Sequence, residues 1–82
     1  MTTNITETTI DASQLACPLP LLKVKQWLAK AAVGGRLRII TTDPGSKRDI
    51  PRFLASTSHT LIAQEEAPSV CIFIIQAGAS NA

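Results

Sequence analysis

The segment that decides the fold is residues 17–45, which read CPLPLLKVKQWLAKAAVGGRLRIITTDPG. From Pro18 to about Val33, apolar side chains recur at spacings of three and four, which predicts an amphipathic helix. The apolar stripe consists of Leu21, Val24, Leu28 and Ala31, and another face carries Lys23, Gln26 and Lys30. Gly34-Gly35 ends this helix, because glycine readily adopts the left-handed C-terminal cap.

A strand and a second helix follow. Arg36 to Thr42 is rich in Ile and Thr, which favours a strand, and Asp43-Pro44-Gly45 is a turn signal. The second helix is expected to be capped by Ser46 or Asp49 and to end near Ser58-His59. Its buried side is supplied by Phe53 and Leu54, and Pro51 is tolerable only in its first turn.

Three further strands complete the pattern. They are predicted at Thr8 to Ile10, Thr60 to Glu66 and Val70 to Gln76, and the last two form an antiparallel hairpin around Ala67-Pro68-Ser69. The order is therefore β-α-β-α-β-β. Because strand-helix-strand crossovers are right-handed, both helices are expected to cover one face of a four-stranded mixed sheet. The predicted fold is an α/β two-layer sandwich.

Size and composition favour one domain. The chain has 82 residues, 45% hydrophobic and 17% charged, and its net charge of +2 is far from the basic footprint of a dedicated nucleic-acid binder. We expect a single domain at 7–77 with flexible ends at 1–6 and 78–82. The first residues lack a secretory signal and no apolar run approaches a bilayer span, so we expect a cytoplasmic protein without membrane contact.

The candidate reactive group is Cys17, in Cys17-Pro18-Leu19-Pro20 at the boundary between turn and helix. This position predicts Cys17 as N-cap and Pro18 as the first helical residue. The helix N-terminus stabilises a thiolate, so we expect the pKa of Cys17 to lie below the reference of about 8.5. The prolines carry no N–H, which leaves Leu19 and Leu21 as the nearest donors to the sulfur.

A second segment, residues 43–49, is expected beside Cys17. Both helices begin where parallel strands end, at the same edge of the sheet. Lys47 or Arg48 would favour the thiolate there, whereas Asp49 would disfavour it if its carboxylate pointed at the sulfur instead of capping the second helix. The sequence leaves both arrangements open.

The remaining candidates have simpler interpretations. Cys71 lies in an apolar strand and is expected to be a buried core residue, not a resolving thiol. Cys17, Cys71 and His59 lack the paired spacing of zinc ligands, so no metal site is predicted. His59 is expected in an exposed loop, Trp27 packed or half-packed, and Asp49 as a helix cap.

The segments at residues 11–20 and 43–53 resemble the TusA-like (SirA-like) sulfur-carrier family, and the resemblance covers nearly the whole domain. It implies a fold like the C-terminal domain of translation initiation factor three. It also implies a persulfide carrier or sulfurtransferase acting through Cys17, with no separate cofactor and with site-shaping roles for Pro18, Leu19, Pro20, Arg48 and Asp49. One position departs from the family pattern, because Gln14 stands where glycine is usual.

The resemblance also implies partner proteins. A donor such as a cysteine desulfurase or a rhodanese would load Cys17, and a downstream protein would accept the sulfur for tRNA thiolation, cofactor sulfuration, sulfur oxidation or selenium handling. Lys23, Lys47 and Arg52 are candidates for docking an acidic partner, although an ordinary solvated face fits them equally well. The alternative function is a non-catalytic regulatory or RNA-associated module, which would tolerate Cys17→Ser. Direct binding of nucleic acid is not expected.

Overall fold

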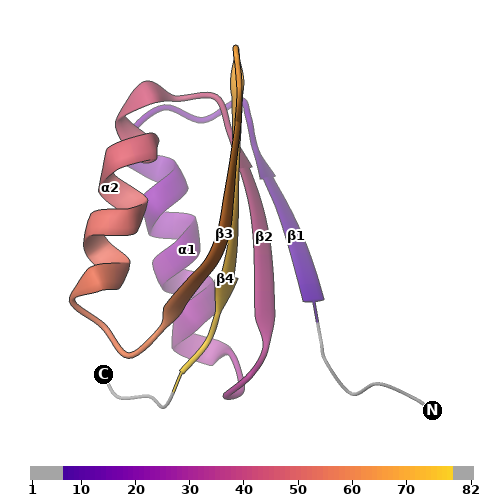
Figure 1. Cartoon of the computed structure of the whole chain (residues 1–82), viewed down its shortest axis with the longest axis vertical. Coiled ribbons are helices and arrows are strands. Elements are labelled where there is room, and N and C mark those ends of the chain that lie inside the picture. Colours follow the sequence, from indigo (N-terminus) through magenta and orange to yellow (C-terminus); the bar gives the residue numbers. More distant parts are fainter. Residues whose placement is uncertain (1–6, 79–82) are drawn as a thin grey trace.

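A computed structural model describes residues 7–78, which form six elements in the order β-α-β-α-β-β. They are β1 (Glu7–Ala12), α1 (Leu19–Lys30), β2 (Arg36–Thr41), α2 (Pro44–Ala55), β3 (Thr60–Ala67) and β4 (Val70–Gln76). The strands form one sheet in the order β1-β2-β4-β3; β1 runs parallel to β2, and β4 is antiparallel to both its neighbours. Both helices lie on the same face of the sheet (Figure 1), so the predicted two-layer α/β sandwich is confirmed.

The core lies between that face and the helices. The alternating burial of β2 and β4 turns Leu37, Ile39, Phe73 and Ile75 inward, and these side chains pair across the two strands. The helices contribute Val24 and Leu28 from α1 and Ile50 and Leu54 from α2. The predicted stripe of the first helix is confirmed, with Leu21 and Ala31 half-buried against the core.

Helix α1 ends at Lys30, three residues before the predicted end at Val33. Ala31 is already extended, with φ −76° and ψ 146°. Beyond the helix, Gly34 N–H donates to the Ala77 carbonyl and Ala77 N–H donates to the Gly35 carbonyl, both at 2.8 Å, so this segment is joined to the end of β4. Gly34 has φ +90°, a conformation that favours glycine, but it lies in the turn before β2 and the C-cap is Ala31, so the prediction that Gly34-Gly35 caps and ends the helix is wrong.

Helix α2 begins earlier than the sequence predicts. The side chain of Asp43 accepts a hydrogen bond from Ser46 N–H at 3.0 Å, so Asp43 is the cap and Pro44 opens the helix; the predicted caps Ser46 and Asp49 are wrong. Pro51 consequently lies inside the helix, not in its first turn. An interior proline costs about 3 kcal/mol, and burial of Ile50 and Leu54 on either side, at about 1.5–3 kcal/mol each, offsets that cost.

The other boundaries differ little. The hairpin of β3 and β4 is confirmed, with a register shift between Leu61 and Ala63, and α2 ends at Ala55, before the predicted stop near Ser58. The ends predicted to be flexible are 1–6 and 78–82, and of these residues 1–6 and 79–82 lie outside the described part of the chain. Gly78 is held in place, because its N–H donates to His59 Nδ1 at 3.0 Å. Among the described residues, neither helix is long and apolar enough to cross a bilayer.

Candidate functional site

The site lies at the sheet edge where the parallel strands β1 and β2 end. After β1, Leu15 N–H donates to the Ala12 carbonyl at 3.0 Å and closes a tight turn that contains the exposed Gln14. After β2, the Thr42 hydroxyl donates to the Ser13 carbonyl at 2.6 Å and joins the two turns directly. The start of each helix is thereby fixed relative to the other.

Cys17 lies in a turn immediately before α1. The Cys17–Pro18 peptide bond is cis, and Leu19 N–H donates to the Ala16 carbonyl at 2.8 Å. The N-cap of α1 is Pro18, which makes no side-chain capping bond, and helical residues begin at Leu19. The prediction of Cys17 as N-cap and of Leu19 N–H as a donor to the sulfur is wrong, because that N–H is used within the turn.

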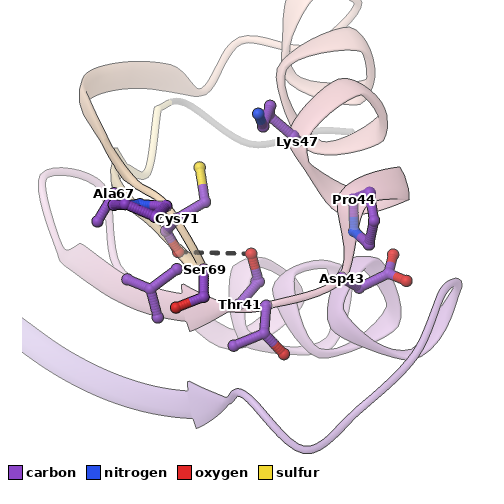
Figure 2. A pocket seen from close by; sticks show the side chains of 10 residues that line it. Thr41, Asp43, Pro44, Lys47, Ala67, Ser69 and Cys71 are labelled. Carbon is purple, nitrogen blue, oxygen red and sulfur yellow. Dashed lines mark hydrogen bonds between the residues drawn. The ribbon is translucent and has the colours of Figure 1, made fainter.

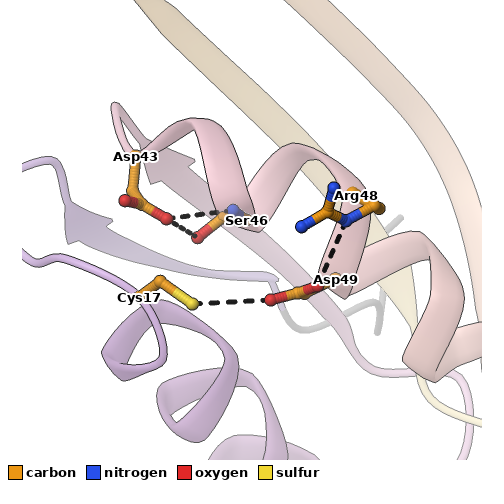
Figure 3. A network of polar contacts seen from close by, with 5 residues as sticks. All are labelled: Cys17, Asp43, Ser46, Arg48 and Asp49. Carbon is orange, nitrogen blue, oxygen red and sulfur yellow. Dashed lines mark hydrogen bonds and ion pairs between the residues drawn. The ribbon is translucent and has the colours of Figure 1, made fainter.

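The partner of the sulfur is a carboxylate. The Cys17 thiol donates to Asp49 Oδ2 with an Sγ–Oδ2 distance of 3.5 Å, and Figure 3 shows the two side chains pointing toward each other, one from the turn before α1 and the other from α2. Of the two arrangements left open by the sequence, the structure has Asp49 facing the sulfur. Asp43 takes the capping position that was expected for Asp49.

This contact determines the electrostatics of the thiol. The pKa of Cys17 lies above its ordinary value, first because the hydrogen bond to Asp49 favours the protonated form. Partial loss of hydration and the negative charges of Asp49 and Asp43 act in the same direction, and Arg48 acts in the opposite one. The predicted fall in the Cys17 pKa is therefore wrong, since Leu19 N–H is used within the turn and the thiol donates to a carboxylate.

Gly45 is a site residue that the sequence interpretation treated only as part of a turn signal. A Cβ at Gly45 would lie 3.0 Å from Asp43 Oδ2 and 3.4 Å from both Cβ and Sγ of Cys17. Glycine thus permits the first turn of α2 to approach the sulfur closely. The sequence signal was available, because glycine directly after an Asp-Pro turn and before a helix often marks such an approach.

The other predicted site residues have mixed placements. Pro18 and Leu19 are exposed beside Cys17, whereas Pro20 is buried beneath the turn. Arg48 Nε lies 3.8 Å from Asp49 Oδ1, so it contacts the site through Asp49. Lys47 Nζ is instead 3.5 Å from Glu66 Oε1. Lys23 and Arg52 are exposed and form no ion pair with any residue of 7–78.

Cys71 occupies a different environment. It is 5% exposed and lines a hollow of about 120 Å³ between the hairpin and the start of α2 (Figure 2). Burial raises the pKa of its thiol, as does the charge of Glu66, while Lys47 and Gln64 lower it. The predicted burial of Cys71 is confirmed.

Two other residues have different outcomes. The predicted half-packing of Trp27 is confirmed. His59 is half-buried and accepts a hydrogen bond from Gly78 N–H, so its expected exposure is wrong.

Residues 8–77 match the family model described as sulfurtransferase TusA. The chain belongs to the TusA sulfurtransferase family. A relative named sulfur carrier protein TusA, from Pseudomonas entomophila (strain L48), is 37% identical over 76 residues, covering 93% of this chain and 95% of the relative. The sulfur carrier protein TusA of Pseudomonas aeruginosa (strain LESB58) is 34% identical over 74 residues, covering 90% and 94%.

A solved structure agrees with this assignment. The crystal structure of a SirA-like protein from Desulfitobacterium hafniense has a TM-score of 0.73 at 25% identity and covers 88% of this chain and 99% of that chain. The fold and the TusA-like, SirA-like family predicted from residues 11–20 and 43–53 are therefore confirmed. In this chain the thiol of the Cys-Pro-x-Pro segment is hydrogen-bonded to a carboxylate.

Proposed function

We propose that the protein is a sulfur carrier in which Cys17 holds sulfane sulfur as a persulfide between a donor protein and an acceptor protein. The observation that carries the proposal is the position of Cys17, an exposed thiol in a turn at the edge where both helices begin. Membership of the TusA family and the names of its relatives support the same function. The sulfur is carried covalently, so the reaction requires no cofactor.

The chemistry is exchange between thiols. The Cys17 thiolate attacks the outer sulfur of the donor's persulfide, a new bond forms from Sγ to that sulfur, the donor's S–S bond breaks, and the donor cysteine leaves as a thiolate. In the second transfer Cys17 is the leaving group. Each step exchanges one sulfur–sulfur bond for another, so neither an external oxidant nor a reductant is consumed. Direction depends on which partner docks and on how the acceptor uses the sulfur.

The partners are expected to dock on the surface around the Cys17 turn. Leu19 and Leu22 on the first turn of α1 are 45% and 43% exposed, which offers apolar contact area beside the thiol. Lys23 and Arg52 are exposed cations suited to an acidic part of a partner's surface, and Lys47 contributes if Glu66 releases it. A cysteine desulfurase or a rhodanese suits the donor role, since each presents a persulfide on cysteine.

The cytoplasm suits this function. Both cysteines are free, and a reducing compartment keeps an exposed thiol such as Cys17 available for exchange. We therefore propose that loading and unloading take place there.

The test is mass spectrometry after incubation with a persulfide-bearing donor and no reductant. The protein should gain one sulfur atom on the Cys17 peptide, and a thiol reductant should remove it, which separates a persulfide from a sulfinic acid. Cys17→Ser should gain none, whereas Cys71→Ala, the matched control, should gain as much as the wild type. Equal gain by Cys17→Ser, or no gain by the wild type from several donors, would favour the regulatory module instead.

A further inference from the structure

The surroundings of the Cys17 sulfur are acidic, although the chain as a whole has a net charge of +2. Asp49 Oδ2 accepts directly from the thiol at 3.5 Å. Asp43 Oδ2 and Cys17 Sγ both border the position that a Cβ on Gly45 would occupy, at 3.0 and 3.4 Å respectively. Two carboxylates, one from the cap of α2 and one from its second turn, therefore flank one thiol.

Lys47 and Arg48, the cations of residues 43–49, do not neutralise the negative charges of Asp43 and Asp49. Arg48 contacts Asp49 through Nε at 3.8 Å, and its side chain is 76% exposed, so solvent screens the pair strongly. Lys47 is directed to Glu66 on β3. Asp43 remains engaged with the N–H and hydroxyl of Ser46, bonds that position its carboxylate and leave its charge in place.

This arrangement has a cost for sulfur transfer, because the attacking species must be a thiolate. The hydrogen bond and the two negative charges hold Cys17 in the protonated form, consistent with the raised pKa of that thiol. Among the described residues, only Arg48 lies where its charge lowers the pKa of Cys17 and so favours the thiolate. A partner that supplies a positive charge at this point would provide what the free protein lacks.

We propose that Asp43 and Asp49 select partners that present an arginine or lysine beside the sulfur, and that pairing with this cation activates Cys17. The inference rests on the proposed carrier function. When the cation pairs with Asp49, the carboxylate no longer accepts from the thiol, the thiol proton passes to solvent, and the thiolate attacks the donor's outer sulfur. In the free protein the same carboxylates keep the thiol protonated, which also slows its oxidation.

The first test uses small disulfides of different charge and needs no sulfane sulfur. Cystamine is cationic, hydroxyethyl disulfide is neutral and dithiodiglycolate is anionic. Each exchange rate at Cys17, followed by mass spectrometry of its peptide, is divided by the rate of the same reagent with N-acetylcysteine amide, which corrects for the leaving group. At low salt, we expect the wild type to favour cystamine over dithiodiglycolate by about fivefold or more, the scale of one close charge pair in water.

The variants assign this preference to residues. Asp49→Asn and Asp43→Asn should each reduce the preference for the cationic reagent, and Asp49→Asn should also shift the pH profile of alkylation by iodoacetamide to lower pH. Asparagine retains the capping ability of Asp43. Asp11→Asn is the matched control, an exposed carboxylate bonded to Ser13 N–H instead of to the thiol, and should leave the preference unchanged. A preference that is absent in the wild type, or that survives both variants, overturns the proposal.

The second test connects the selection to sulfur transfer. Two synthetic donor peptides carry a cysteine persulfide flanked by arginine or by glutamate, and the arginine peptide should load Cys17 faster, with the difference reduced in Asp49→Asn. Equal loading by both peptides overturns the selection while leaving the carrier function intact. If neither peptide nor any protein donor loads Cys17, the carrier function fails, and the disulfide series still decides whether the carboxylates select by charge.

Discussion

Cys17 and Cys71 carry the same side chain in opposite surroundings. The pKa of each thiol is raised, but Cys17 is exposed and held by a hydrogen bond to Asp49, whereas Cys71 is 5% exposed and is affected mainly by burial. A hydrogen bond to a carboxylate can be exchanged when a partner docks, while burial ends only when the structure opens. The contrast teaches that access, more than acidity in the free protein, distinguishes the two thiols.

Alkylation should reveal the largest difference between the two thiols. With iodoacetamide at pH 8, Cys17 should react more than about tenfold faster than Cys71, because Cys71 must wait for local opening of the sheet. Peptide mass spectrometry over time gives both rates. In urea the two rates should converge; similar rates in the folded protein would contradict the comparison.

Replacing each thiol by alanine should affect stability unequally. Cys71→Ala removes a side chain packed in the core and should lower the free energy of unfolding by about 1–2 kcal/mol. Cys17→Ala should change it by less than about 0.5 kcal/mol, as is usual at exposed positions. Urea titration followed by circular dichroism measures both. A larger loss for Cys17→Ala would show that the turn depends on the sulfur for its structure.

Gly45→Ala should change the reactivity of Cys17, and this change should not arise from a loss of stability. The added methyl group would press on Asp43 Oδ2 and on the Cys17 sulfur, so we expect the alkylation rate of Cys17 to change severalfold. Gly34→Ala is the matched control at the other end of β2, where φ is +90°. It should lower stability by about 1 kcal/mol and leave the Cys17 rate unchanged. The reverse pattern would remove Gly45 from the site.

The pH dependence of stability should depend on Cys71. A thiol whose pKa is higher in the folded than in the unfolded state stabilises the fold below the unfolded pKa, and this contribution is lost as pH rises through the folded pKa. The contribution of Cys71 to stability should therefore decline above pH about 8.5, with a slope of at most about 1.4 kcal/mol per pH unit for its one proton, beside the separate contribution of Cys17, whose pKa is also raised. Urea titrations from pH 7 to 10 should show a shallower decline in Cys71→Ala.

The smallest effect is expected at the exposed cations. Lys23→Glu and Arg52→Glu should slow loading of Cys17 by a protein donor about two- to threefold at low salt and less at high salt, with little loss of stability. Lys30→Glu, in the last turn of α1, is the matched control. Identical loading kinetics in all three variants would indicate that Lys23 and Arg52 belong to an ordinary solvated surface and do not dock a partner.

Much of the fold was predictable because its signals are local. The Ile-rich strands, the spacing of Val24 and Leu28 and the glycines after α1 gave the element order and the face that each helix buries. The start of α2 was not predictable in the same way, because any of Ser46, Asp43 and Asp49 can cap a helix. Only the packing of Ile50 and Leu54 on both sides of Pro51 explains why the helix continues through a proline.

The sequence predicted which segments form the site better than it predicted the chemical state of the thiol. The parallel strands required residues 43–49 to lie beside Cys17, and they do. The direction in which Asp49 points depends on a contact 32 residues away in sequence, which no local pattern encodes. The hydrogen bond from Leu19 to Ala16 likewise depends on the turn that Cys17 and Pro18 adopt, and it removed the donor on which the expected thiolate depended.

Strand β4 pairs with both β2 and β3, although it is the last of the six elements along the chain. During synthesis on the ribosome, the motif around Cys17 therefore emerges long before the central strand that joins β2 to β3. Leu37 and Ile39 lack their cross-strand neighbours Ile75 and Phe73 until then. Because a domain folds as a unit once its chain is available, we expect newly made chains to become competent for sulfur loading only after translation has passed β4. The order of the strands would thus delay loading of Cys17 until β4 has been made.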